Sequence, residues 1–212
     1  MRSLPQTDLY GITCEALSRG RDNLTVVREL LAAGVRIIQY REKTKTKKEK
    51  YAECLALSQM CREAGALFVV NDDVDLALLT GAGAVHVGQD DLPADAVRKL
   101  VGPDVIVGVS ASSMEEAHDA VARGADYLGV GPIYRTATKE DAGEAVGLDL
   151  LQEIARTFTL PLVAIGGITP DNIREVMRRG AACAAMISAL VGAEDIAAAV
   201  QAARRNLSGD GR

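Results

Sequence analysis

The sequence predicts an α/β fold, a single-domain (β/α)8 TIM barrel, on three observations. A helical stretch that ends at a glycine and runs at once into a short apolar segment recurs along the chain, as in LLAAGVRIIQYRE. Glycine ends a helix by taking the left-handed conformation, and strand-length runs rich in β-branched residues follow it. Eight such runs alternate with eight helical patterns, which implies parallel pairing through right-handed crossovers. The length of 212 residues suits a compact barrel.

The eight strands follow from apolar runs in chain order. They are expected in DLYGIT (8–13), LLAAGVRIIQYRE, CREAGALFVVND, LLTGAGAVHVGQ, DVIVGVS (104–110), AVARGADYLGVGP, LPLVAIGG (160–167) and VMRRGAACAAMIS. Helical patterns lie near 23–33, 46–64, 73–80, 93–100, 113–123, 148–157, 171–179 and 193–205. No linker interrupts the pattern, so we expect one domain over 1–212, with a frayed tail from about 206 to 212. An open doubly wound sheet is the alternative arrangement.

Composition excludes several classes of function. The formal charge of −5 and an aromatic content of 3% without tryptophan are unlike a nucleic-acid-binding protein. No apolar run reaches the length of a membrane span, and no signal peptide is recognisable. The four cysteines form no C-x-x-C motif, and Cys54 and Cys61 fall seven apart in a helical pattern. We therefore expect a cytoplasmic monomer or homodimer that binds small molecules and neither nucleic acid nor membrane.

In a barrel the chemistry lies at the carboxyl ends of the strands, so the residues that close each strand are the candidates. In QYREK, alternation places Gln39, Arg41 and Lys43 on one face, with Tyr40 and Glu42 on the other. An amide, a guanidinium and an ammonium together can hold an anion. A surface strand end with an Arg–Glu pair is the alternative.

Two later loops carry a second anion signal. The run AIGGITPDNI joins a glycine pair to a helix that begins near Pro170, with Thr169 or Asp171 available as its cap. Its backbone N–H groups, together with MISA after strand 8, suit the phosphate position that is frequent in barrels. The alternative is that the glycines only permit tight turns. The long loop GPIYRTATKEDAGEAVG presents hydroxyls and a lysine that suit phosphate oxygens, and a plain polar loop is the alternative.

The run LFVVNDDVDLA ends an apolar strand in two adjacent carboxylates. Asp72 closes strand 3 and Asp91 follows strand 4, so both are expected at the same rim. Oxygen ligands without nearby histidine or cysteine suit Mg²⁺, whereas helix capping is the simpler explanation; we assign Asp73 to the cap. His86 and His118 are expected to be structural or on the surface, so the chemistry should need no strong base or covalent nucleophile.

Taken together, these motifs resemble those of the thiamine phosphate synthase family along almost the whole chain. They are QYREK (39–43), VNDD (70–73), HVGQDD (86–91), GVS (108–110), GPIYRTATK (131–139), IGGIT (165–169) and MIS (186–188). The resemblance implies transfer of a hydroxymethylpyrimidine group from its diphosphate to the nitrogen of thiazole phosphate. It also implies one Mg²⁺ per active site. The sequence departs from the family pattern at Arg135 and in CAAMIS, which bears on loop geometry.

The resemblance also assigns residues to roles. It implies a pyrimidine diphosphate site made by Gln39, Tyr40, Arg41, Glu42, Lys43, Asn71, Ser110 and Lys139. The thiazole phosphate site would be Thr136, Ala137, Thr138, Gly167, Ile187 and Ser188, and the metal ligands would be Asp72 and Asp91. Among these, the catalytic residues would be Arg41, Lys43, Ser110 and Lys139. Two alternatives are a thiazole tautomerase-like relative, which would need an acid or base, and a non-catalytic barrel that binds thiazole or phosphate.

Overall fold

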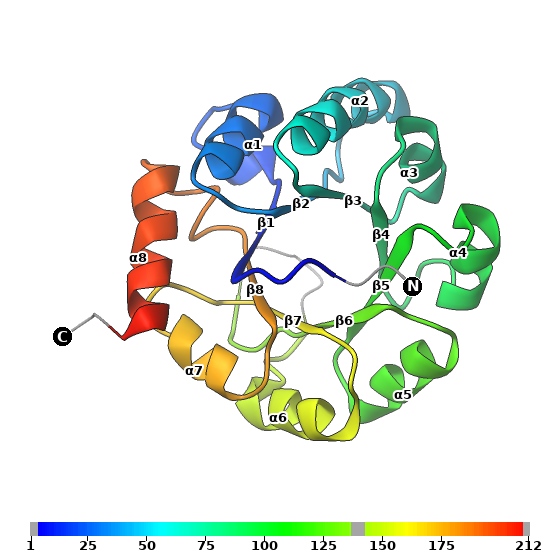
Figure 1. Ribbon diagram of the computed structural model, residues 1–212, viewed down its shortest axis with the longest axis vertical. Helices are drawn as coiled ribbons and strands as arrows, with labels where there is room; N and C mark the ends of the chain where they lie inside the picture. Colours follow the sequence, from blue (N-terminus) through cyan, green and yellow to red (C-terminus); the bar gives the residue numbers. More distant parts are fainter. Residues whose placement is uncertain (1–3, 137–142, 210–212) are drawn as a thin grey trace.

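Eight parallel strands form a closed barrel in the computed structural model, which describes residues 4–136 and 143–209 (Figure 1). The strands are β1 Leu9–Ile12, β2 Ile37–Tyr40, β3 Leu67–Asn71, β4 Ala84–Val87, β5 Ile106–Ala111, β6 Tyr127–Val130, β7 Leu162–Ile165 and β8 Cys183–Met186. They pair in chain order, and β1 pairs with β8. This closure confirms the predicted barrel and excludes the open sheet.

Helices surround the barrel as an outer ring (Figure 1). In the described part of the chain they are α1 Asn23–Ala32, α2 Lys47–Glu63, α3 Val74–Thr80, α4 Ala94–Val101, α5 Met114–Ala122, α6 Gly147–Thr157, α7 Ile173–Arg178 and α8 Ile196–Ser208, with a short 3-10 helix η1 Glu15–Leu17. As predicted, a glycine with positive φ follows α1, α2, α3, α5 and α7: Gly34, Gly65, Gly81, Gly124 and Gly180. Helix α8 runs to Ser208, past the point at which we expected a frayed tail.

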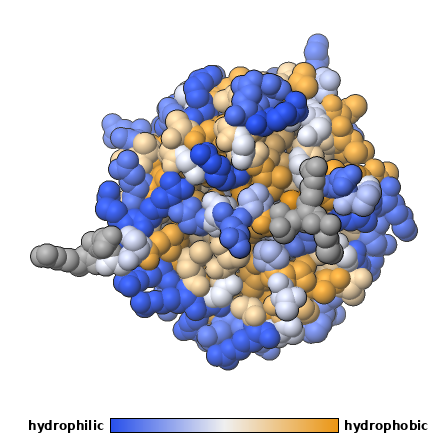
Figure 2. Space-filling view, viewed as in Figure 1, coloured by the Kyte–Doolittle hydropathy of each residue, from blue (hydrophilic) through white to orange (hydrophobic). Residues whose placement is uncertain are grey.

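Side chains alternate between two hydrophobic cores. The larger core lies between the strands and the helices, and a smaller one fills the barrel with residues such as Tyr10, Ile37 and Tyr127. Each strand points every second residue inward. The inner core therefore continues, toward the carboxyl ends of the strands, into the residues that close them. Figure 2 shows polar residues around the periphery of the face seen in Figure 1, as expected where helices turn their polar sides to solvent. Within the described ranges, no helix is long and apolar enough to cross a membrane.

Arg204 joins the last helix to the beginning of the barrel. Its Nε lies 2.7 Å from a carboxylate oxygen of Asp8, just before β1, and its other nitrogens donate to the carbonyls of Ala33 and Gly34. Burial alone would raise the pKa of Asp8, but the hydrogen bond and the charge of Arg204 outweigh burial and lower it. The ion pair therefore holds the first and last elements together at neutral pH.

We expect Asp8→Asn to lower the free energy of unfolding by about 1–2 kcal/mol at pH 7. The pKa of Asp8 is lowered in the folded state, so its contribution is present above the ordinary value near 3.8 and is lost as the pH falls through the folded value. Urea unfolding should therefore show a smaller difference in the free energy of unfolding between wild type and Asp8→Asn at pH 3 than at pH 7. Asp104→Asn, at an exposed carboxylate, is the control and should change little. An undiminished difference at pH 3 would contradict this account.

Candidate active site

A cavity of about 350 Å³ opens at the carboxyl ends of the strands. Every strand contributes at least one lining residue, namely Ile12, Gln39, Asn71, His86, Ser110, Gly129, Ile165 and Ala185 in order from β1 to β8. The loops add Arg41, Thr136, Gly167, Ile187 and Ser188, among others. The structure thus brings eight of the candidate residues to one cavity: Gln39, Arg41, Asn71, Ser110, Thr136, Gly167, Ile187 and Ser188. Ala137, Thr138 and Lys139 lie outside the described residues.

The residues from Gln39 to Glu42 follow the alternation predicted for QYREK, although β2 ends at Tyr40 and Lys43 does not line the cavity. Gln39 points into the barrel and donates to the Tyr10 hydroxyl, whereas the Tyr40 hydroxyl donates to Glu53 of α2 on the outer side. The next residue, Arg41, lines the cavity. Glu42 turns away again and accepts a hydrogen bond from the backbone of η1. The side chains of Tyr40 and Glu42 therefore support the strand end from behind, and their contact with a substrate stays a prediction.

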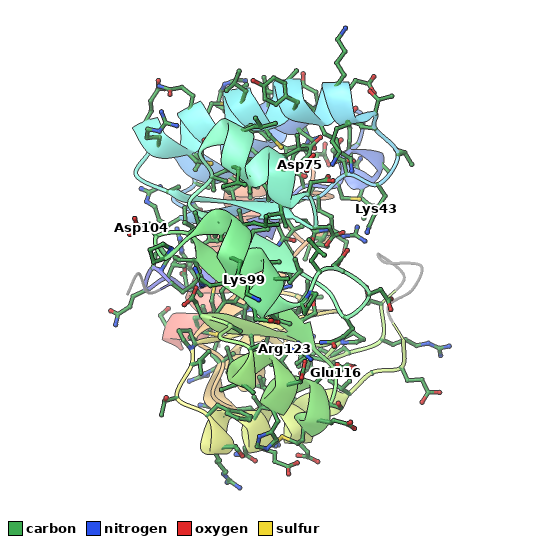
Figure 3. All side chains as sticks on the ribbon, turned by 90° about the vertical axis from the view of Figure 1, so that its right-hand side faces the viewer. Lys43, Asp75, Lys99, Asp104, Glu116 and Arg123 are labelled. Carbon is green, nitrogen blue, oxygen red and sulfur yellow. The ribbon has the colours of Figure 1, made fainter. Side chains whose placement is uncertain are left out.

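Two carboxylates and a lysine meet beside this cavity. The Nζ of Lys43 lies 3.0 Å from Asp72, and Asp91 accepts from the Gly88 N–H at 2.8 Å. Burial raises the pKa of Asp91; the Gly88 N–H opposes this, and a hydrogen bond with Asp72 together with the charge of Asp72 raise it further. In Figure 3, Lys43 lies at the opposite end of the barrel from Asp104. A carboxylate whose pKa is raised by a second carboxylate beside it provides a favourable position for a cation.

The backbone of Asp72 supports this interpretation. Its φ is +60°, a left-handed conformation that costs a non-glycine residue roughly 1–2 kcal/mol. The backbone N–H of Asp72 donates to the carbonyl of His86 and its carbonyl accepts from Val74, so the conformation is fixed from both sides. No group of three or more His, Cys, Asp or Glu that could hold an ion is present within the described ranges. Two carboxylates fit Mg²⁺, which commonly completes its shell with water and substrate phosphates.

The structure corrects two predicted helix caps. Asp73 occupies the N-cap position of α3, but its side chain caps nothing. Its carboxylate instead accepts hydrogen bonds from Lys47 and Lys50, which both lie on α2. At the GGIT turn neither Thr169 nor Asp171 acts as the cap. Asn172 fixes the turn by accepting from the backbone of Thr169 and donating to the carbonyl of Gly167.

Unpaired backbone N–H groups indicate an anion site between the loops that follow β7 and β8. A short helical turn starts after Ile187, whose carbonyl accepts from Leu190 and Val191. In the part of the chain that the structure describes, the N–H groups of Gly167, Ser188 and Ala189 donate to no protein acceptor. Gly167 and Ser188 line the cavity. Unpaired N–H groups at the start of a helical turn attract phosphate.

Sequence reasoning missed the position of His86. The ring lines the cavity; its Nδ1 lies 2.9 Å from the Tyr127 hydroxyl and its Nε2 lies 2.9 Å from the Ser110 hydroxyl. A single histidine in a strand has no periodic signal, but its place two residues after inward-facing Ala84 would have shown the direction of its side chain. His118, as expected, packs away from the site, with its ring 4.8 Å from that of Phe158.

Two glycines make space for the rings of Tyr127 and His86. A Cβ at Gly108 would lie 2.1 Å from Tyr127, and a Cβ at Gly129 would lie 2.9 Å from the ring of His86. We expect Gly108→Ala to lower the free energy of unfolding by about 1–3 kcal/mol through overpacking. The double variant Gly108→Ala with Tyr127→Ala should lose less than the sum of the two single losses, because the smaller side chain removes the clash. Urea unfolding of all four proteins measures this coupling, and strictly additive losses would refute the clash.

Comparisons with known proteins find relatives over most of the chain. A family model described as "Thiamine monophosphate synthase" matches residues 9–190. The chain is 51% identical to a thiamine-phosphate synthase of Pelotomaculum thermopropionicum, over 98% of this chain and 95% of the relative. It is 44% identical to one of Caldicellulosiruptor saccharolyticus, over 89% and 86%. A solved structure of thiamine phosphate pyrophosphorylase from Pyrococcus furiosus superposes with a TM-score of 0.87 at 40% identity, over 95% of this chain and 96% of that one.

Proposed function

The chain belongs to the thiamine monophosphate synthase family, whose members are transferases, and we propose that both substrates of thiamine phosphate synthesis meet in its one cavity. The reaction joins the hydroxymethylpyrimidine group of a diphosphate ester to the nitrogen of thiazole phosphate and releases pyrophosphate. The observation that supports this placement is the pairing of two unlike anion sites at one cavity. One has Arg41 in the cavity, with Lys43 and two carboxylates beside it, and the other has unpaired backbone N–H groups.

The diphosphate is proposed to bind between β2 and β4. Arg41 offers a planar guanidinium to its oxygens, and Lys43 adds a second positive charge. Asn71 closes β3 in the same cavity and can donate its amide protons. Lys139 is proposed to join them from beyond the described residues. The side chains of this region thus favour an ester that carries two phosphates on the pyrimidine side.

One Mg²⁺ is proposed to bind Asp72 and Asp91. The carboxylates face one another at the rim, and Lys43 already bonds to Asp72. A bound Mg²⁺ would supply positive charge that stabilises the leaving diphosphate. Lys43 is then well placed to move between the carboxylate and a diphosphate oxygen.

Thiazole phosphate is proposed to place its phosphate against the N–H groups of Gly167, Ser188 and Ala189. Thr136 lines the same cavity, and Ala137 and Thr138 are proposed to complete the site. Ile187 also lines the cavity and provides an apolar surface for the ring. The site then holds the thiazole nitrogen on the side of β8 and the pyrimidine on the side of β2 to β5.

We propose that the reaction is a dissociative substitution. Arg41 and Lys43 neutralise charge on the diphosphate as its C–O bond breaks. The electron pair leaves with pyrophosphate, and the electron-rich aminopyrimidine stabilises the positive charge on its methylene carbon. The thiazole nitrogen then forms the C–N bond with its lone pair. This nitrogen carries no proton, so no general base is needed, and the residues act by positioning and electrostatics.

We propose a cytoplasmic location for the protein. All four cysteines are free thiols, and three of them are buried, which fits a reducing cytoplasm. Small molecules are the proposed partners, and a monomer or homodimer is the proposed assembly.

The reaction can be tested with purified protein, both substrates and Mg²⁺, by measuring thiamine phosphate and pyrophosphate. We expect both products in equal amounts, and none after chelation of the metal. Asp72→Asn should lower the rate at limiting Mg²⁺ by about 100-fold because a charged ligand is lost. Asp104→Asn, at the far end of the barrel (Figure 3), should not change the rate.

The outcomes separate the alternatives. Wild-type protein that makes no product would contradict the synthase function and favour a tautomerase-like or non-catalytic barrel. Full activity of Asp72→Asn at limiting Mg²⁺ would contradict only the metal assignment.

The phosphate site can be tested by removing one N–H group. Ala189→Pro deletes the backbone N–H near the start of a helical turn, where proline is tolerated. We expect the KM for thiazole phosphate to rise about tenfold and the KM for the pyrimidine diphosphate to stay the same. Ala189→Ser keeps the N–H and should behave as wild type. Equal KM values for Ala189→Pro and Ala189→Ser would remove this residue from the site.

A further inference from the structure

We propose that His86 is a positioning residue: a directed chain of hydrogen bonds through the barrel interior fixes its tautomer, so that the Ser110 hydroxyl becomes a donor to the pyrimidine ring. This inference rests on the proposed function, since it concerns the substrate that Ser110 faces. It assigns a role to Tyr10, His86 and Tyr127, which no step of the reaction above uses.

The chain crosses the inside of the barrel and has Gln39 and Ser110 at its ends. Gln39 Nε2 lies 2.8 Å from the Tyr10 hydroxyl, which lies 3.1 Å from the Tyr127 hydroxyl. The Tyr127 hydroxyl lies 2.9 Å from His86 Nδ1, and His86 Nε2 lies 2.9 Å from the Ser110 hydroxyl. Four hydrogen bonds therefore connect two residues that line the cavity from β2 and β5.

The first bond fixes the direction of the others. An amide NH2 group can only donate, so the Tyr10 oxygen accepts from Gln39. The Tyr10 hydroxyl is then free to donate, and Tyr127 is its other hydrogen-bond partner among the described residues. Tyr127 in turn donates to His86 Nδ1. The His86 proton must therefore reside on Nε2, from which it is donated to Ser110.

The reverse direction leaves a buried donor without a partner. If His86 Nδ1 donated to Tyr127 and Tyr127 to Tyr10, the Tyr10 oxygen would accept twice and its own proton would have no acceptor. Tyr10 and Tyr127 are 1% and 0% exposed, so no solvent could replace the missing acceptor. A buried unpaired hydroxyl is strongly disfavoured. Burial also raises the pKa of both tyrosines, so each keeps the proton that the chain requires.

The barrel interior is shaped around this chain. The space for Tyr127 exists because residue 108 is glycine, and the space for His86 exists because residue 129 is glycine. The ring centroids of His86 and Tyr127 lie 5.4 Å apart, and those of Tyr10 and Tyr127 lie 6.5 Å apart. Packed rings of this kind have little freedom to turn, so the distances between the hydrogen-bonding atoms of the chain are maintained.

The direction has a consequence for the ligand. Ser110 accepts from His86, so its own proton is available to the cavity and requires an acceptor there. At the other end, one N–H of Gln39 is used on Tyr10, which leaves its carbonyl oxygen as an acceptor and its second N–H as a donor. The Ser110 donor complements an unprotonated ring nitrogen, and the Gln39 carbonyl oxygen can accept from an amino group. An aminopyrimidine has both groups.

The tautomer can be measured directly. The chain has two histidines, so a His118→Gln variant with ¹⁵N-labelled histidine reports on His86 alone. We expect ¹⁵N NMR at pH 7.5 to show a protonated Nε2 and an unprotonated Nδ1 in the ligand-free protein. Adding Tyr127→Phe removes the donor to Nδ1 and should shift the population toward the other tautomer. A protonated Nδ1 in the His118→Gln protein would overturn the proposal, even if no tyrosine variant folds.

Kinetics test whether the chain acts through Ser110. We expect Tyr127→Phe to raise the KM for the pyrimidine diphosphate about fivefold to tenfold and to leave the KM for thiazole phosphate unchanged. In a Ser110→Ala background, Tyr127→Phe should have no further effect on that KM, because the two residues act in series. Tyr51→Phe, at an exposed tyrosine of α2, is the control. Additive effects of Tyr127→Phe and Ser110→Ala would overturn the proposal.

The two failures are distinguishable. If wild-type protein makes no thiamine phosphate, the proposed function fails, while the NMR result still decides the tautomer. If wild-type protein is active and His86 has its proton on Nδ1, the function stands and this inference falls.

Discussion

The hydrogen bonds between β1 and β8 close the sheet, and this closure decides which side chains share a cavity. In an open sheet, Ile12 and Ala185 would lie at opposite edges, whereas here both line the same space. Closure also creates an interior, and the polar chain from Gln39 to Ser110 exists only because strands on different sides of the barrel face one another. Arg204 secures this arrangement by bonding the last helix to the carboxylate that precedes the first strand.

The fold could be predicted because its signals repeat. Five helix-to-strand turns contain a glycine at the same place, and each of these glycines has the positive φ that the pattern requires. Alternation at QYREK was also predictable, since a period of two follows from any strand. The caps were not: Asp73 has the right residue type at the right place, yet two lysines of α2 compete for its carboxylate. Local propensity cannot include a neighbour that only the tertiary structure supplies.

His86 was missed for a related reason. From the sequence it is one histidine within an apolar strand, and its partners are a tyrosine 41 residues away and a serine 24 residues away. Their meeting depends on the register of three strands and on two glycines that leave space for the rings. The left-handed backbone conformation of Asp72 was equally unpredictable. The residue type tells which chemistry a carboxylate can perform, but it does not tell the backbone dihedral angle.

The unpaired N–H groups at Gly167, Ser188 and Ala189 have a consequence for how such a protein can evolve. Every residue except proline has a backbone N–H donor. Binding through such donors can therefore persist when the surrounding side chains change. In the run CAAMIS and the turn that follows it, the N–H groups of Ser188 and Ala189 stay without a protein acceptor among the described residues, and this depends on the course of the backbone. Recognition of this kind is inherited through chain geometry, and comparisons of side-chain identity will underestimate how well it is preserved.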